Sequence, residues 1–136
     1  MVGVVFHWDA KPYFDYSHQR LWYQQYEYSC RAFEAEKIVV VDPADAVSLG
    51  ISKARDLETA LRFFTGATPV LIHASGKEEL SGFVHPVDAV YIVGPDYGSF
   101  DLPENSKSVR IPVARPVELW AATALSIVLY DRYLRT

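Results

Sequence analysis

The chain has 136 residues, half of them hydrophobic, and a formal net charge of −4 at pH 7. A chain of this length buries one sizeable core and excludes a second one, so residues 1–136 are expected to form a single domain. The negative charge argues against a broad electrostatic grip on nucleic-acid backbone, which relies on many Lys and Arg residues.

The cysteine content and the apolar segments indicate the cellular compartment of the protein. Cys30 is the single cysteine, which excludes an internal disulfide and fits a reducing compartment. The N-terminus has no basic region before its apolar part and reaches Asp9, unlike a secretory signal. The apolar run near the C-terminus is too short to span a bilayer. We therefore expect a cytoplasmic protein without a membrane contact.

The first elements alternate between strand and helix. A run rich in valine predicts a strand at Val2–Phe6, and helical spacing of apolar residues predicts a helix over Tyr16–Phe33. Asp15 is a suitable N-cap for this helix. A second strand is predicted at Lys37–Val41.

The middle of the chain continues this alternation. A helix is predicted over Asp56–Phe64 and stops at Gly66, which tolerates left-handed C-cap geometry. A strand at Pro69–His73 and one short helical turn within Lys77–Phe83 follow.

The C-terminal part predicts two more strands, Ala89–Val93 and Ser108–Ile111, and a closing helix over Glu118–Asp131. The strands are mostly continuous apolar runs, as parallel strands are when helices cover both faces of a sheet. We expect an α/β fold with a mostly parallel sheet of about five or six strands. The closing helix is apolar nearly all round from Leu119 to Leu129, so it needs a second contact surface, either a threaded loop or a partner subunit.

Loops at the carboxyl ends of the strands are the expected ligand site of such a sheet. Gly94 and Gly98 remove side chains where a backbone can approach a ligand, and Pro95 stiffens that turn. Ile111, Pro112 and Val113 offer an apolar wall. The loops that this rule selects are His7–Trp8, Asp42–Pro43, His73–Gly76, Gly94–Gly98 and Pro112–Pro116.

The sequence lacks the motifs of several common classes of enzyme. No Gly-x-Gly-x-x-Gly follows the first strand and no phosphate-binding loop motif occurs, which disfavours nicotinamide and nucleoside-triphosphate enzymes. The four histidines are scattered singly, so no metal site is expected. Ser75 lacks the flanking glycines of a hydrolase nucleophile elbow.

Three linked C-terminal segments carry a family resemblance. The run Tyr91–Asp96, then Val109–Pro112, then Glu118–Asp131, resembles the second and third motifs of the SPOUT superfamily, especially the SpoU-type RNA 2'-O-ribose methyltransferases. Cys30–Pro43 resembles the first-motif helix end and the following strand of that family. The match spans most of the chain in order.

The resemblance implies a C-terminal trefoil knot, S-adenosylmethionine bound against the knot loops, and a homodimer built partly on the last helix. It implies tRNA or rRNA as substrate. The dimer would explain the second contact surface of the closing helix. The alternative is a helix that sits centrally in an ordinary monomeric sheet.

By this resemblance, cofactor-binding positions fall at the strand ends. Gly94 matches the glycine whose backbone meets the cofactor, and Ile111 with Leu119 match the apolar positions that hold the adenine. The loop at His73 would touch the ribose, or His73 is only a hydrogen-bonded strand end. The remaining cofactor-binding candidates are Pro95, Asp96, which stands where the family has glutamate, and Val113.

The catalytic positions depart from the family pattern. Glu118 and Trp120 stand where the family has serine and asparagine, and the first-motif arginine falls on Tyr28. Arg20 could orient a phosphate or lower a hydroxyl pKa, with a solvated helix residue as the alternative. The catalytic candidates are therefore Arg20 and Glu118.

The N-terminal third is rich in aromatic residues. Exposed aromatics beside basic residues can stack unpaired bases. The candidates for RNA contact are Trp8, Tyr13 and Phe14.

The sequence thus predicts an S-adenosylmethionine-dependent RNA methyltransferase acting on a ribose 2'-hydroxyl. One alternative is a related protein that binds the cofactor or RNA without methyl transfer, because the catalytic positions are replaced. Another is an unknotted α/β nucleotide-binding domain.

Overall fold

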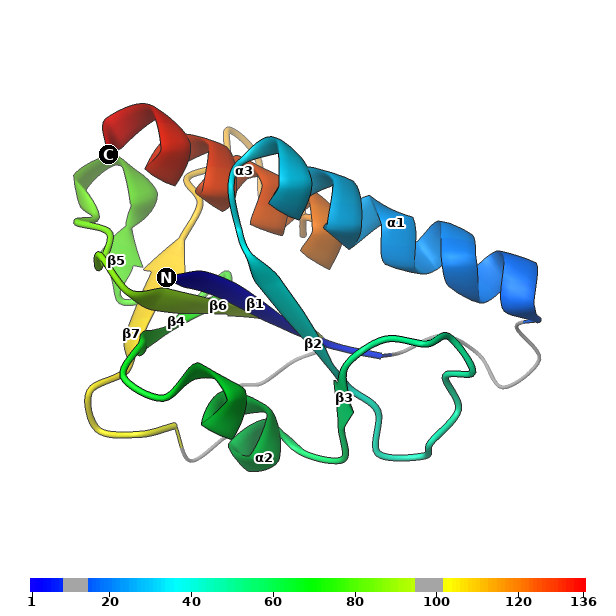
Figure 1. Ribbon diagram of the computed structural model, residues 1–136. Coiled ribbons are helices and arrows are strands. Elements are labelled where there is room, and N and C mark those ends of the chain that lie inside the picture. The colour runs from blue at the N-terminus through cyan, green and yellow to red at the C-terminus, as the bar shows by residue number, and fades with distance from the viewer. Residues whose placement is uncertain (9–14, 95–101) are drawn as a thin grey trace.

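A parallel sheet forms the centre of the computed structural model, which describes residues 1–8, 15–94 and 102–136. Seven strands in these ranges follow the order β3-β2-β1-β6-β4-β7-β5, and each pair of neighbours is parallel. Helices α1 and α3 lie over one face of the sheet and α2 lies under the other (Figure 1). The strands are β1 Val2–His7, β2 Lys37–Val41, β3 Lys53–Ala54, β4 Thr68–Ile72, β5 Glu78–Glu79, β6 Ala89–Val93 and β7 Lys107–Arg110.

The parallel α/β architecture is confirmed, with more strands than predicted. β3 and β5 have two residues each and lie at the two edges of the sheet. Segments this short carry no hydrophobic periodicity, so the sequence gives no signal for them. The short helical turn predicted within Lys77–Phe83 is present as a 3-10 turn at Leu80–Gly82, and the two residues of β5 precede it.

The first two helices begin where capping residues indicate. α1 spans Tyr16–Ala32, and the Asp15 carboxylate accepts the backbone N–H of His18 at 3.0 Å. α2 is shorter than expected: it ends at Leu61 and continues as a 3-10 turn, Arg62–Phe64, before Gly66 adopts a φ of 90°.

The closing helix begins later than predicted. α3 spans Ala121–Arg135, and Glu118 and Leu119 lie in the loop before it. Trp120 has an extended backbone, with φ −62° and ψ 147°, and provides no side-chain cap, so the helix starts only at the next residue.

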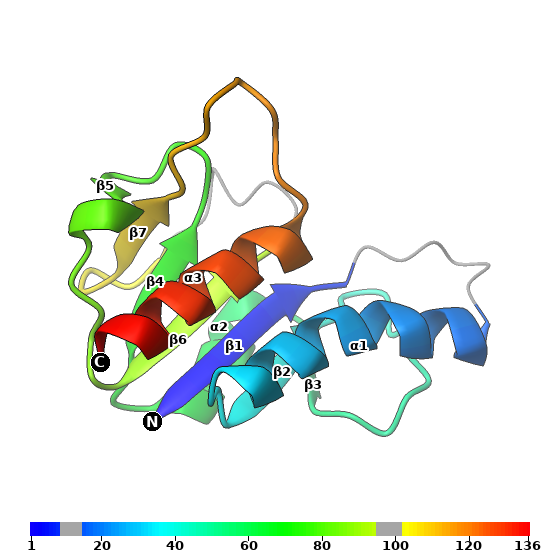
Figure 2. The same cartoon turned by 90° about the horizontal axis from the view of Figure 1, so that it is seen from above.

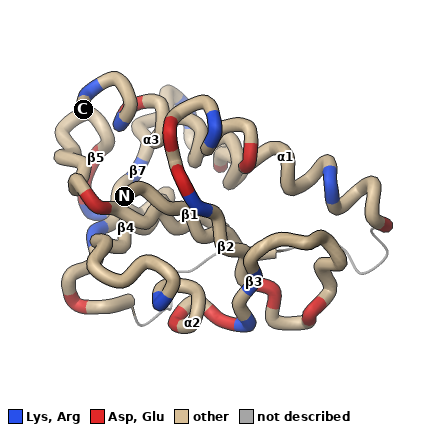
Figure 3. Tube along the Cα trace, viewed as in Figure 1, with Lys and Arg blue, Asp and Glu red and all other residues tan. Residues whose placement is uncertain are grey.

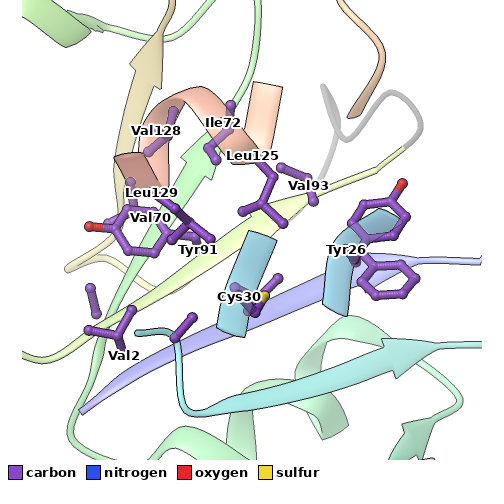
Figure 4. Close-up of a cluster of buried hydrophobic side chains, with 14 of the residues drawn as sticks. Val2, Tyr26, Cys30, Val70, Ile72, Tyr91, Val93, Leu125, Val128 and Leu129 are labelled. Carbon is purple, nitrogen blue, oxygen red and sulfur yellow. The ribbon is translucent and has the colours of Figure 1, made fainter. Parts of the chain in front are cut away.

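The main core lies between the sheet and the helix pair α1 and α3. The Phe6 ring of β1 stacks on Tyr26 of α1 with ring centroids 3.8 Å apart. Leu125 and Leu129 of α3 lie beside Tyr91 of β6 in the same cluster (Figure 4). A second, smaller core lies on the opposite face, under α2.

The closing helix covers only part of its apolar surface within one chain. Figure 2 shows α1 and α3 on the same face of the sheet. Leu125, Val128 and Leu129 are buried, whereas Ile127 and Leu134 are exposed. The burial on two sides that the sequence predicts is therefore not complete in a single chain.

A buried polar chain joins β6 to the end of α3. His85 bonds through Nδ1 to the Tyr91 hydroxyl and through Nε2 to Asp131, each at 2.7 Å. Arg135 donates to the same Asp131 carboxylate. Burial lowers the pKa of His85 below its ordinary value of 6.5, against the opposing pull of Asp131.

Residues 95–101 of the connection between β6 and β7 lie outside the described ranges. The trefoil knot accordingly stays a prediction. Within the described residues, no helix is long and apolar enough to cross a membrane.

Candidate functional site

A cavity of about 820 Å³ opens at the carboxyl ends of β4, β6 and β7. Its outer border is the connection from β7 to α3, which arches beyond the ends of β4 and β7 (Figure 2). Parallel strands end at the same edge of a sheet, so their following loops converge there. The lining residues are Ile72, His73, Ala74, Val93, Gly94, Ile111, Val113, Pro116, Val117, Glu118, Leu119, Trp120, Ala121 and Ala124.

The cavity brings together most of the positions that the sequence singled out. Five cofactor-binding candidates line it, and so does one catalytic candidate, Glu118. Pro95 and Asp96 lie outside the described residues. Those that line it as cofactor-binding candidates are His73, Gly94, Ile111, Val113 and Leu119.

Arg20 is separate from this cavity. It lies on α1, is exposed, and is not among the described residues of the lining. Its catalytic role stays a prediction.

Gly94 shapes one wall through its backbone. It directly follows β6 and has a φ of 156°, in the region that L side chains rarely adopt. The neighbouring lining residue Val93 is the last residue of β6. Gly94 therefore contributes backbone, and no side chain, to the cavity wall.

The loop after β4 is held close to β7 by backbone contacts. The N–H of His73 donates to the Val109 carbonyl at 3.0 Å, and the Ser75 N–H donates to Nδ1 of His73 at 3.0 Å. A Cβ added to Gly76 would lie 2.4 Å from the Val109 carbonyl carbon, so only glycine permits this approach. Arg110 donates to the carbonyl of Gly76 at 3.0 Å. These contacts fix His73 and Ala74 in the lining.

The lining is mainly apolar, with one carboxylate on its exposed side. Ile72, Val93, Ile111 and Leu119 supply aliphatic walls, whereas Glu118 on the connecting loop is exposed. Such a mixture, aliphatic walls with few polar groups, is typical of small-molecule sites. No cluster of three or more metal-ligating side chains occurs in the described part of the chain.

Several lining residues were missed by sequence reasoning. Ile72 and Val93 are the last residues of β4 and β6, so the strand-end rule that selected their loops would also have found them. Trp120 stands at a replaced motif position, which does not by itself indicate a place in the cavity. Its position at the start of α3 had no sequence signal, because the helix was expected to begin earlier.

One proposed RNA-contact residue is wrong. Trp8 is only 6% exposed and packs against the Trp22 ring, with centroids 4.4 Å apart and planes at 70°. Burial of this indole in the main core leaves no face for a base. Tyr13 and Phe14 lie outside the described residues.

Comparison with known proteins finds similar structures but no similar sequence. None of the protein-family models matches the chain, and no curated protein matches it in sequence. Solved structures do match over nearly its whole length. The SpoU methyltransferase AviRb from Streptomyces viridochromogenes is 18% identical, with a TM-score of 0.72, and covers 98% of this chain. The fold is that of the SpoU methyltransferases.

Other solved structures with the SpoU fold agree. The A. aeolicus TrmH/SpoU tRNA modifying enzyme has a TM-score of 0.72 at 15% identity over 98% of this chain and 74% of its own. A structure described for the 2-OH methylation of C/U34 on tRNA has a TM-score of 0.65 at 17% identity, covering 97% of this chain and 93% of its own. The chain spans 59% of AviRb, so it corresponds to part of that protein.

Proposed function

We propose that this protein is an S-adenosylmethionine-dependent RNA methyltransferase that modifies a ribose 2'-hydroxyl of tRNA or rRNA. The observation that carries this proposal is the cavity, which gathers the motif-matched positions at the strand ends of a SpoU fold. Similar structures include AviRb in complex with AdoMet, with a TM-score of 0.70 at 18% identity, and the structure described for 2-OH methylation on tRNA.

The cavity suits the cofactor in size and chemistry. Its volume of about 820 Å³ lies within the range of roughly 300–1,000 Å³ that small-molecule sites occupy. Ile111, Val113 and Leu119 would hold the adenine against aliphatic side chains. Gly94 would offer its backbone, because no Cβ stands between the main chain and the ligand. Pro95 and Asp96, which lie outside the described residues, remain cofactor-binding candidates of this proposal.

The ribose and the reacting end would meet polar groups. The loop at His73 would contact the cofactor ribose, since its position is fixed by the bonds to Val109 and Ser75. Bound S-adenosylmethionine would supply an electrophilic methyl group for transfer to the ribose oxygen, with neutral S-adenosylhomocysteine as the product. Glu118 would accept the hydroxyl proton as a general base. Arg20 would contact an RNA phosphate from α1.

RNA binding would not depend on a broad basic surface. Lys, Arg, Asp and Glu are interspersed along the described trace (Figure 3). With a net charge of −4, RNA contact would rely on local groups near the cavity more than on a long-range field.

We also propose a homodimer through α3 in the cytoplasm. The exposed apolar side chains of α3, including Ile127 and Leu134, would pack against a second copy. The trefoil knot that the family resemblance implies is part of the same proposal.

The experiment is methyl transfer from tritium-labelled S-adenosylmethionine into bulk tRNA and rRNA. We expect label in nucleosides that resist alkaline cleavage, because a 2'-O-methyl group removes the hydroxyl that attacks the phosphate. Glu118→Gln should lower the rate by about 10²-fold or more, the range of general-base contributions. Label that appears only in alkali-sensitive positions would contradict a ribose target.

A second candidate function is binding without transfer. It is favoured by the exposed position of Arg20 outside the cavity lining and by Tyr28 at the place of the first-motif arginine. Saturable cofactor binding without any label in either RNA would support this candidate over the enzyme.

A further inference from the structure

Glu118 and Trp120 are two of the exposed residues that line the cavity, and together they are called the rim. Glu118 and Trp120 flank Leu119 on the loop that leads into α3, and all three residues line the cavity. The Trp120 indole is 79% exposed, far more than Trp8 at 6%. A ligand in the cavity would therefore meet a carboxylate and an indole within one three-residue segment.

The Glu118 carboxylate is the one formal charge in the described lining, with His73 counted as neutral. Within residues 1–8, 15–94 and 102–136, neither a hydrogen bond nor an ion pair engages this carboxylate. A carboxylate beside aliphatic walls favours a cationic ligand group and disfavours a phosphate.

Trp120 also favours a cationic ligand group. The face of an indole carries negative charge density and attracts cations, including onium groups whose own hydration is weak. Carboxylate and indole together therefore match a positively charged, largely apolar group. The sulfonium of S-adenosylmethionine is such a group, whereas its demethylated product, S-adenosylhomocysteine, has a neutral thioether.

We propose that Glu118 and Trp120 recognise the sulfonium and so distinguish the cofactor from its demethylated product. The inference rests on the proposed function, since it assumes that this cavity takes S-adenosylmethionine. Loss of the positive charge on methyl transfer removes the attraction to the rim. The spent cofactor then leaves more readily, and a fresh molecule replaces it.

Calorimetry with the purified chain tests this selectivity. Dissociation constants for S-adenosylmethionine and S-adenosylhomocysteine are measured for the wild type, Glu118→Gln and Trp120→Leu. We expect each variant to lower the preference for the sulfonium form by roughly threefold to thirtyfold, the range of cation–π and exposed charge contributions. Affinity for S-adenosylhomocysteine should change little.

Two controls separate the rim from general effects. Glu104→Gln makes the same chemical change on an exposed turn outside the described lining, and should leave the preference unchanged. Trp120→Phe keeps an aromatic face and should retain part of the preference. Both rim side chains are exposed, so the variants are expected to fold.

The outcomes distinguish this inference from the proposed function. If Glu118→Gln and Trp120→Leu bind the cofactor with an unchanged preference for the sulfonium form, the rim does not recognise the sulfonium. The proposed function then remains intact. An unchanged preference with weaker RNA binding in Trp120→Leu overturns sulfonium recognition in favour of base stacking. Absence of any cofactor binding in the wild type overturns both.

Discussion

Gly94 is the residue on which the shape of the cavity most depends. Its φ of 156° disfavours any residue with a Cβ, and its place in the lining leaves a side chain no room beside a ligand. An L side chain here costs roughly 1–3 kcal/mol in backbone strain and adds atoms where the ligand would lie.

Replacing this glycine should therefore weaken cofactor binding. We expect Gly94→Val to raise the dissociation constant for S-adenosylmethionine by about tenfold or more, which corresponds to about 1.4 kcal/mol. Calorimetry gives the affinity, and circular dichroism confirms that the fold is intact. Wild-type affinity in a folded variant would remove Gly94 from the site.

Gly76 is required for a different reason, because the backbone of β7 leaves no space for a Cβ at this position. Gly76→Ala would place a Cβ 2.4 Å from the Val109 carbonyl carbon, so the loop after β4 must move away. We expect a loss of about 1–3 kcal/mol in the free energy of unfolding, measured with urea. Gly82→Ala is the matched control, because its Cβ meets nothing within 4 Å. Equal stability of the two variants would contradict the close approach.

At the residue scale, strand-end positions were predictable and rim positions were not. His73 and Gly94 follow short apolar runs whose ends can be read from the sequence. Trp120 was not assigned to the site, because its role depends on where α3 begins. The extended backbone of Trp120 sets that boundary, and no capping side chain marks it in the sequence.

At the scale of elements, His85 links the segment before β6 to the end of α3. The neutral imidazole accepts the Tyr91 hydroxyl and donates to Asp131, so both ring nitrogens are used. Tyr91, Asp131, Arg132 and Arg135 are the ionisable groups that act on it. The desolvated ring resists protonation, which lowers its pKa in the folded state.

This shift predicts a loss of stability in mild acid. The unfolded chain keeps a histidine pKa near 6.5, so it binds more protons than the folded chain as the pH falls through that value. The free energy of unfolding should therefore decrease below about pH 6.5. In His85→Gln, urea unfolding should show a smaller decrease between pH 7 and pH 5. An equal decrease in both proteins would exclude His85 as the source.

α3 also carries the proposed dimer contact, and the structure sharpens its test. Leu125 is fully buried in the core of one chain, so a charge there would unfold the chain and report nothing on association. Ile127 is 36% exposed on the same helix and is the better position.

A charge on the outer face of α3 should therefore separate the subunits. We expect Ile127→Asp to halve the mass measured by light scattering while the chain stays folded. Phe63→Asp is the control, because Phe63 is exposed on the 3-10 turn after α2, which lies on the opposite face of the sheet. A dimeric Ile127→Asp variant would contradict this contact.

At the scale of the whole molecule, the alternation of strands and helices was enough to predict the parallel α/β sheet. Continuous apolar runs such as Ala89–Val93 indicate burial on both faces, and all five residues of β6 are buried. The edge strands β3 and β5 were missed because pairing with a neighbour, and not their own sequence, makes them strands. The spatial order of the strands was likewise not predicted, since periodicity along the chain says nothing of neighbours in space.

Binding of S-adenosylmethionine in the cavity at the ends of β4, β6 and β7 underlies both the proposed function and the role of the rim. The most direct test is calorimetric titration of the wild-type chain with this cofactor, with adenosine triphosphate as a comparison ligand. We expect saturable binding at one site per chain for S-adenosylmethionine and none for the triphosphate, whose phosphates the Glu118 carboxylate disfavours. No binding of S-adenosylmethionine at high micromolar concentration would contradict it.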